Sequence, residues 1–215
     1  MRRMEKLVLA IIAVSFVIGI ALYPEMPETM ASHWNAAGEV DGYMPKFWGL
    51  FLMPLITLGM FLLFVAIPRI DPLKANIEKF RGNFDMFILV IIFFMFYIYL
   101  LTLLWTMGYR FSMIQLMSPA LALLFYYAGI LIQNAKRNWF IGIRTPWTLS
   151  NNQVWDKTHK LGAKMFKVAA VIILAGIVLP DYAIYFILIP ILFAAFYLVI
   201  YSYLEYRKLE KKKAL

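Results

Sequence analysis

Residues able to do chemistry gather first between two apolar runs near the start of the chain. The segment holds a histidine and several polar and aromatic residues that form our first group of candidate ligand-binding residues: His33, Trp34, Asn35, Gly38, Asp41, Gly42 and Lys46. A histidine and a carboxylate can share a cation or move a proton. One His with one Asp has no recognisable metal-ligand spacing, so the pair is only a weak metal candidate. We therefore predict no metal site and no cofactor. Two readings stay open: a polar ligand site, or a compact loop folded over its neighbours.

The charge of this segment limits what it would bind. Glu25, Glu28, Glu39 and Asp41 face a single basic residue, Lys46. A surface of this sign favours cationic ligands over anionic ones. The stretches Asn-Ala-Ala-Gly and Asp-Gly, which begin at Asn35 and Asp41, are both predicted to form turns.

A second group of specific residues lies in the stretch from 134 to 167. Its members are the candidate partner-binding residues Asn138, Gly142, Arg144, Thr145, Pro146, Trp147, Thr148, Trp155, Thr158 and His159. A guanidinium such as that of Arg144 can donate paired hydrogen bonds to a carboxylate or a phosphate. Tryptophans and lysines also anchor proteins at a lipid interface. Lipid anchoring and docking of a partner are both compatible with the pattern.

Local signals predict how this second segment folds. Thr145 precedes a proline, which favours an extended link. Ser150 and Gln153 have the spacing of a capping box, so a helix is predicted to begin at Asn151 and to continue to Leu179.

The elements that position both groups are membrane-spanning helices. Of the 215 residues, 63% are hydrophobic and 15% are charged, whereas soluble proteins carry about 25% charged residues. Apolar runs of about 20 residues match the hydrocarbon core, where backbone groups must bond within a helix. We predict an all-α, polytopic membrane protein with six spans: Leu7–Tyr23, Phe47–Ile67, Met86–Met107, Met113–Ile132, Met165–Leu179 and Tyr182–Leu204.

Basic residues give these spans a direction. With the N-terminus inside, only Lys46 and Arg110 of the 21 Lys and Arg fall outside. The positive-inside rule therefore predicts three hairpins in the cell membrane, with both termini cytoplasmic. The first group then faces outward and the second inward. We divide the chain into an N-terminal hairpin, 1–85, with outer loop 24–46 and inner loop 68–85, and a four-helix region, 86–215, with inner loop 133–164.

Two details of this topology have alternatives. The first span, which ends near Gly19-Ile20-Ala21, also resembles a signal peptide, and cleavage there would leave five spans. Pro54, Pro119 and Pro190 lie in the outer halves of the three inward-running helices. Prolines are common in membrane helices, but three kinks at similar depth would splay the outer ends and open a shallow cavity there.

Several classes of function lack their signatures in this sequence. The chain has no cysteine, which excludes disulfides and thiolate sites. We find none of the short catalytic or nucleotide-binding motifs. His33 and His159 are predicted on opposite sides of about 30 Å of bilayer, so they cannot share a metal. No Asp, Glu, Lys or Arg lies near the middle of a span, which disfavours ion-coupled transport. We expect a protein that is not an enzyme.

The stretches that contain the two residue groups both resemble motifs of one protein family. The stretch NWFIGIRTPWTLSNNQVWDKTHKLGAKMF resembles the signature of the SdpI-type immunity proteins, through the ten residues of the second group. The outer stretch resembles the small domain of unknown function often found at the N-terminus of that family. It does so through Pro27, His33, Asn35, Gly38, Asp41, Gly42 and Lys46. Together the two resemblances extend over nearly the whole chain.

The resemblance implies a role in binding. Members of the family are expected to protect the membrane from an exported peptide toxin and to hold a repressor protein at the membrane. The partners implied are the lipid bilayer, a peptide toxin outside and a cytoplasmic repressor, with no direct contact to nucleic acid. Two alternatives remain: a transporter or channel for a small or lipidic substrate, and a membrane enzyme that uses His33 with Asp41.

Overall fold

Six long helices dominate the computed structural model, which describes residues 2–36 and 38–213. They are α1 (Arg3–Leu22), α2 (Lys46–Ile70), α4 (Arg81–Thr106), α5 (Met113–Asn134), α7 (Asn152–Val178) and α8 (Ala183–Lys213). Each is long and apolar enough to cross a membrane, and a short 3-10 turn, η1 (Pro180–Tyr182), precedes α8. The prediction of six apolar spans is confirmed.

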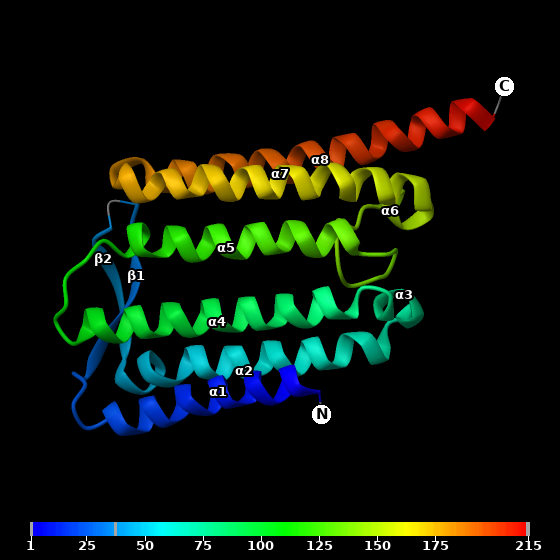
Figure 1. Ribbon diagram of the computed structural model, residues 1–215. Helices are drawn as coiled ribbons and strands as arrows, with labels where there is room; N and C mark the ends of the chain where they lie inside the picture. The colour runs from blue at the N-terminus through cyan, green and yellow to red at the C-terminus, as the bar shows by residue number, and fades with distance from the viewer. Residues whose placement is uncertain (1, 37, 214–215) are drawn as a thin grey trace.

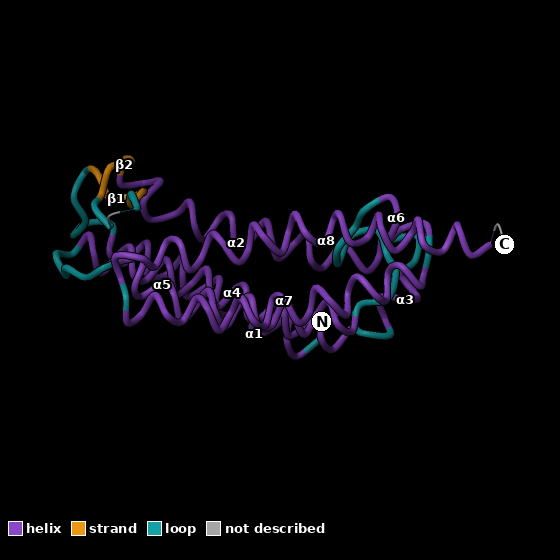
Figure 2. The backbone as a smooth tube through the Cα atoms, turned by 90° about the horizontal axis from the view of Figure 1, so that it is seen from above, coloured by secondary structure: helices purple, strands orange, loops and turns teal. Residues whose placement is uncertain are grey.

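The helices form two layers. They run side by side along one direction, with a small sheet at one end and both termini at the other (Figure 1). Seen along the perpendicular direction, α1, α4, α5 and α7 make one layer, and α2 and α8 lie on the same side of it (Figure 2). α2 packs against α1 and α4, whereas α8 packs against α7 and α5. The first half of the molecule thus contains α1, α2 and α4, and the second contains α5, α7 and α8. The contact between α4 and α5 joins these two halves. The division at residue 85 stays a prediction, because α4 contacts α1 and α2 as well as α5.

A β-hairpin forms in the segment 24–46, where the sequence predicted a loop with turns. β1 (Thr29–Trp34) pairs antiparallel with β2 (Val40–Pro45). The turn at Asn35 is confirmed, since Gly38 has a φ of +81° and donates to the Asn35 carbonyl at 2.9 Å. The predicted turn at Asp41-Gly42 is wrong: both residues lie within β2, where the register between the strands is irregular. The all-α description therefore needs this one small sheet added.

The opposite end of the molecule, called the loop end below, is also more ordered than expected. Two short helices, α3 (Lys74–Glu78) and α6 (Pro146–Ser150), lie there (Figure 1). The predicted helix start at Asn151 is one residue early, because Asn151 itself is the cap and accepts from Gln153 N and Val154 N. Ser150 instead ends α6, and its hydroxyl donates to the Trp147 carbonyl. Asx side chains cap at least as well as serine, which explains the shift. The continuous helix through span five is confirmed, ending at Val178.

Buried apolar clusters lie at both ends of the bundle. A large buried cluster near the loop end joins α1, α2 and α4 to Trp155 of α7. A smaller cluster under the hairpin contains Met26, Met30, Leu50, Tyr99 and Leu103. Met30 fits there because Gly49 has no side chain, and a Cβ on Gly49 would lie 2.7 Å from the Met30 sulfur. The hairpin is thereby fixed on the ends of α2 and α4.

Candidate functional site

A cavity of about 670 Å³ lies beneath the hairpin. It is bounded by both strands and by the hairpin-end portions of α2, α4, α5 and α8, so it lies between the two halves of the molecule. Its wall is mainly apolar and rich in methionine: Met44, Met53, Met113 and Met117. A cavity was predicted at this end, but Pro54, Pro119 and Pro190 do not line it, so proline kinks as its cause stay a prediction.

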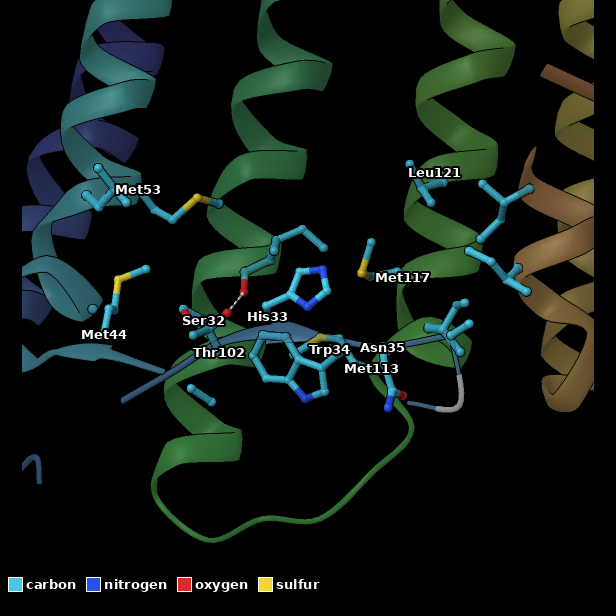
Figure 3. Close-up of a pocket in the computed structure, with 18 of the residues that line it drawn as sticks. Ser32, His33, Trp34, Asn35, Met44, Met53, Thr102, Met113, Met117 and Leu121 are labelled. Carbon is cyan, nitrogen blue, oxygen red and sulfur yellow. Dashed lines mark hydrogen bonds between the residues drawn. The ribbon is translucent and has the colours of Figure 1, made fainter. Parts of the chain in front are cut away.

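Three members of the first residue group line this cavity. His33, Trp34 and Asn35 extend from the end of β1 across its mouth, with Met113 and Met117 beside them (Figure 3). The His33 side chain is 69% exposed, and its Nδ1 lies 2.5 Å from Asp41 Oδ1. Asp41 thus holds the His33 ring from the neighbouring strand without lining the cavity itself. His33, Trp34 and Asn35 thus form a polar rim over this apolar cavity, which is called the chamber below.

The rest of the first group supports the hairpin. Gly42 lies opposite His33, and a Cβ there would come within 2.9 Å of the His33 Cβ. Gly38 allows the turn that begins at Asn35. Lys46 pairs with Glu28 at 2.8 Å and lies over the Tyr23 ring, away from the cavity. Only part of the group therefore belongs to one site.

Trp34 is the least satisfied side chain of the rim. Its ring meets Trp105 of α4 edge-on, at 5.8 Å between centroids. Its indole Nε1 is buried and has no hydrogen-bond partner. A buried N–H without a partner is uncommon in folded proteins and costs stability. Within the described residues, no cluster of three metal-binding side chains occurs here or elsewhere.

The second residue group folds into the loop end, with Asn138 at its centre. The Asn138 side chain is fully buried and makes four hydrogen bonds. Its amide donates to the carbonyls of Lys136 and Ile141, and its carbonyl oxygen accepts from Phe140 N and Ile141 N. One asparagine therefore fixes the turn that follows α5.

His159 and Trp155 connect that turn to α7. Their rings stack with centroids 3.9 Å apart. His159 Nε2 accepts from Ile143 N at 3.0 Å, while Nδ1 lies 2.8 Å from the Trp155 carbonyl. Both ring nitrogens are thus satisfied by a neutral imidazole that donates from Nδ1. Gly142, at φ +117°, passes so close to His159 Nε2 that a Cβ would overlap it.

The Thr-Pro-Trp-Thr stretch builds α6 and attaches it to α8. Thr145 and Thr148 cap each other: Thr145 Oγ1 accepts from Thr148 N, and Thr148 Oγ1 accepts from Thr145 N. Pro146 occupies the first helical position, where no N–H is needed. Thr145 Oγ1 also lies 3.0 Å from Ser202 Oγ of α8, and the Trp147 ring packs on Tyr203.

Arg144 and Thr158 differ from their neighbours. Arg144 is exposed, and its guanidinium donates to the carbonyl of Trp139, itself 51% exposed. Arg144, with Pro146 the exposed part of the second group, and the neighbouring Trp139 are therefore available to a partner. Thr158 is fully buried, and its hydroxyl has no partner. Most of the group is therefore turned inward.

Several residues of both sites were not identified from the sequence. Asp71, only 2% exposed, accepts from Leu73 N and from Trp139 N, and so connects the α2–α3 loop to the second group. Glu205, also buried, pairs with Lys157 and Lys208. No local pattern marks the bonds of Asp71 to Trp139 and of Glu205 to Lys157, because each joins distant parts of the chain. Met113 and Met117 could have been noticed, since they are one turn apart at a predicted outer end.

Comparisons with known proteins agree with the motifs. Residues 134–202 match the SdpI/YfhL protein family, and residues 10–58 match a domain of unknown function, DUF1648. The Immunity protein SdpI of Bacillus subtilis (strain 168) is 28% identical over 209 residues, which cover 96% of this chain and 98% of that protein. No solved structure matches the chain significantly. The resemblance drawn from the motifs is confirmed.

Proposed function

The chain resembles the SdpI-type immunity proteins from its first span to its last, and on that premise we propose that it protects its own membrane by binding a peptide at the cavity beneath the hairpin. The similarity to an immunity protein along the whole chain supports a membrane immunity function. The observation that carries the finer proposal is the cavity itself: an apolar chamber of about 670 Å³ with a polar rim.

The chemistry of the chamber suits an apolar segment of a cationic peptide. Methionine side chains adapt to ligands of irregular shape, because they are flexible and polarisable. Asp41 and Glu39, both exposed beside the rim, supply negative charge. A peptide would place apolar side chains among the methionines and its cations near these carboxylates.

A binding role fits this site better than either alternative. A transporter needs a polar path through the bundle, whereas the chamber has an apolar wall and the half nearer the loop end contains a packed apolar cluster. An enzyme using His33 and Asp41 would need further groups around the pair, and the described residues place no cluster of three metal-binding side chains there. Both alternatives therefore lack a supporting observation.

The experiment that tests this proposal fills the chamber. Cells expressing wild type or Met117→Trp, at matched membrane levels, would be challenged with a panel of cationic, apolar membrane-active peptides. We expect protection by wild type against at least one peptide and at least a tenfold loss of survival with Met117→Trp. Leu123→Trp is the matched control, since Leu123 is on the same helix, 55% exposed, and does not line the chamber. Absence of protection by wild type would refute immunity, while protection retained by Met117→Trp would refute the chamber as the binding site.

We also propose that the loop end binds a cytoplasmic regulator through Arg144 and Trp139. The support is their joint exposure, and the hydrogen bond between them, beside the buried side chains of Asn138, Thr145 and Thr148. A pull-down from native membranes would compare wild type with Arg144→Ala, using the exposed Lys136→Ala as the control. A cytoplasmic protein held by wild type and Lys136→Ala, but lost with Arg144→Ala, is the expected result. Equal capture by all three would count against this surface.

A further inference from the structure

A second concave region runs along the helix pair α7–α8. Near the loop end, a small polar pocket of about 220 Å³ is lined by Lys157, Lys160, Leu161, Lys164 and Tyr201. Directly beyond it, an apolar cleft of about 580 Å³ follows the same two helices towards the hairpin end. Lys164 lines both, so the basic pocket and the apolar cleft adjoin at this residue.

Two of the three pocket lysines have no carboxylate partner among the described residues, so their positive charge is available to a ligand. Lys157 is already bound to Glu205 at 2.6 Å, and Glu205 also accepts from Lys208. No described carboxylate lies within ion-pair distance of Lys160 or Lys164, which are one helical turn apart on α7 and exposed. Two neighbouring ammonium groups with a nearby tyrosine suit one phosphate.

The cleft has the shape and chemistry of an acyl-chain site. Buried Ala169 lies along it, and its exposed lining includes Val168, Ile189 and Phe193. The distance from Lys164 to Ile172 along α7 is about 12 Å at 1.5 Å per residue. One leaflet of the hydrocarbon core is about 15 Å deep, half of the whole. A chain held in the cleft would therefore run through one leaflet, with its headgroup at Lys160 and Lys164.

We infer that the α7–α8 hairpin carries a binding site for one anionic phospholipid. Its phosphate is held by Lys160 and Lys164, and an acyl chain lies in the apolar cleft. Charge selects the occupant: the pocket offers uncompensated positive charge, so a zwitterionic lipid gains less there than an anionic one. This inference is independent of the proposed immunity function, since it concerns another face of the molecule.

The test measures thermal unfolding of the purified protein in detergent, with phosphatidylglycerol or phosphatidylcholine added. We expect phosphatidylglycerol to raise the wild-type Tm by several degrees and phosphatidylcholine to raise it clearly less. Lys160→Gln with Lys164→Gln should abolish the difference between the two lipids, whereas the same lysines changed to arginine should keep it. Lys211→Gln with Lys212→Gln is the matched control and should behave as wild type, because both lysines lie on α8 outside the pocket.

Two further measurements separate a lipid from a free phosphate. Glycerol 3-phosphate, the soluble headgroup alone, should leave the Tm unchanged at millimolar concentration. Val168→Trp fills the cleft from an exposed position, and it should lower the number of phosphatidylglycerol molecules retained in native mass spectrometry. Equal stabilisation by both lipids, a full phosphatidylglycerol effect in the double glutamine variant, or a full effect of glycerol 3-phosphate would each overturn the inference.

Discussion

At the scale of single residues, the two histidines have opposite environments. His33 is largely exposed at the rim of the chamber and has one carboxylate partner. His159 is 2% exposed, and both of its ring nitrogens are engaged by the backbone. Residue type therefore says little about role here, and the number of ring nitrogens without a partner says more. His33 has one such nitrogen available for a ligand, whereas both nitrogens of His159 bind the backbone of the loop end.

Gly142 gives the sharpest prediction at this scale. Gly142→Ala forces a side chain into the left-handed region and against His159 Nε2, so we expect a loss of about 1–3 kcal/mol of stability. Thermal unfolding of the purified protein measures it. Gly82→Ala is the control, since Gly82 is exposed and a methyl group added there would have nothing within 4 Å. An equal effect of the two substitutions would show that the contact with His159 is not what restricts position 142.

At the scale of elements, the loop end is assembled by reciprocal bonds between short pieces of chain. α6 has only five residues, too few to be stable alone. Its capping box, its bond to Ser202 and the packing of Trp147 on Tyr203 attach it to α8. The segment is a structural joint between α5, α7 and α8, with Arg144 and Trp139 exposed on its surface.

The Thr145 hydroxyl should control this joint. Thr145→Val keeps the size of the side chain but removes the cap and the contact with Ser202, and we expect about 1 kcal/mol to be lost locally. Hydrogen exchange of the amides from 147 to 150 would then be faster, with α1 and α2 unaffected. Thr145→Ser restores a hydroxyl and should restore protection. Unchanged exchange in Thr145→Val would mean that Pro146 and Trp147 suffice to hold α6.

Prediction from the sequence succeeded where signals are local and failed where they are long-range. Apolar runs identified every spanning helix, because lipid allows the backbone few other solutions. The β-hairpin was missed because its strands are short and its register is irregular. The role of Asn138 could not be foreseen, since its bonds depend on how the turn folds. Likewise the chamber has walls from six separate elements, and only His33, Trp34 and Asn35 were identified from the sequence.

At the scale of the whole molecule, the layered arrangement places the two candidate surfaces at opposite ends of the bundle (Figure 1). The charge pattern predicts that the hairpin end faces outward and that both termini are cytoplasmic. This orientation determines which partner can reach which surface, so both proposed binding roles depend on it.

The absence of cysteine makes the orientation simple to measure. Ala36→Cys lies in the exposed hairpin turn, and Ser150→Cys lies at the exposed end of α6. In right-side-out membrane vesicles, an impermeant maleimide should label the Ala36→Cys protein directly. The Ser150→Cys protein should be labelled only after detergent is added. The reverse pattern would invert the topology and, with it, both proposed binding roles.

The separation of α2 from α8 has a mechanical consequence. Both helices pack on the layer formed by the other four, and they are held in place by that layer and not by contact with each other (Figure 2). The chamber occupies the hairpin end of the space between α2 and α8. Little direct contact between α2 and α8 opposes their spreading, so the width of the chamber is set by how each of them packs on the layer of four helices.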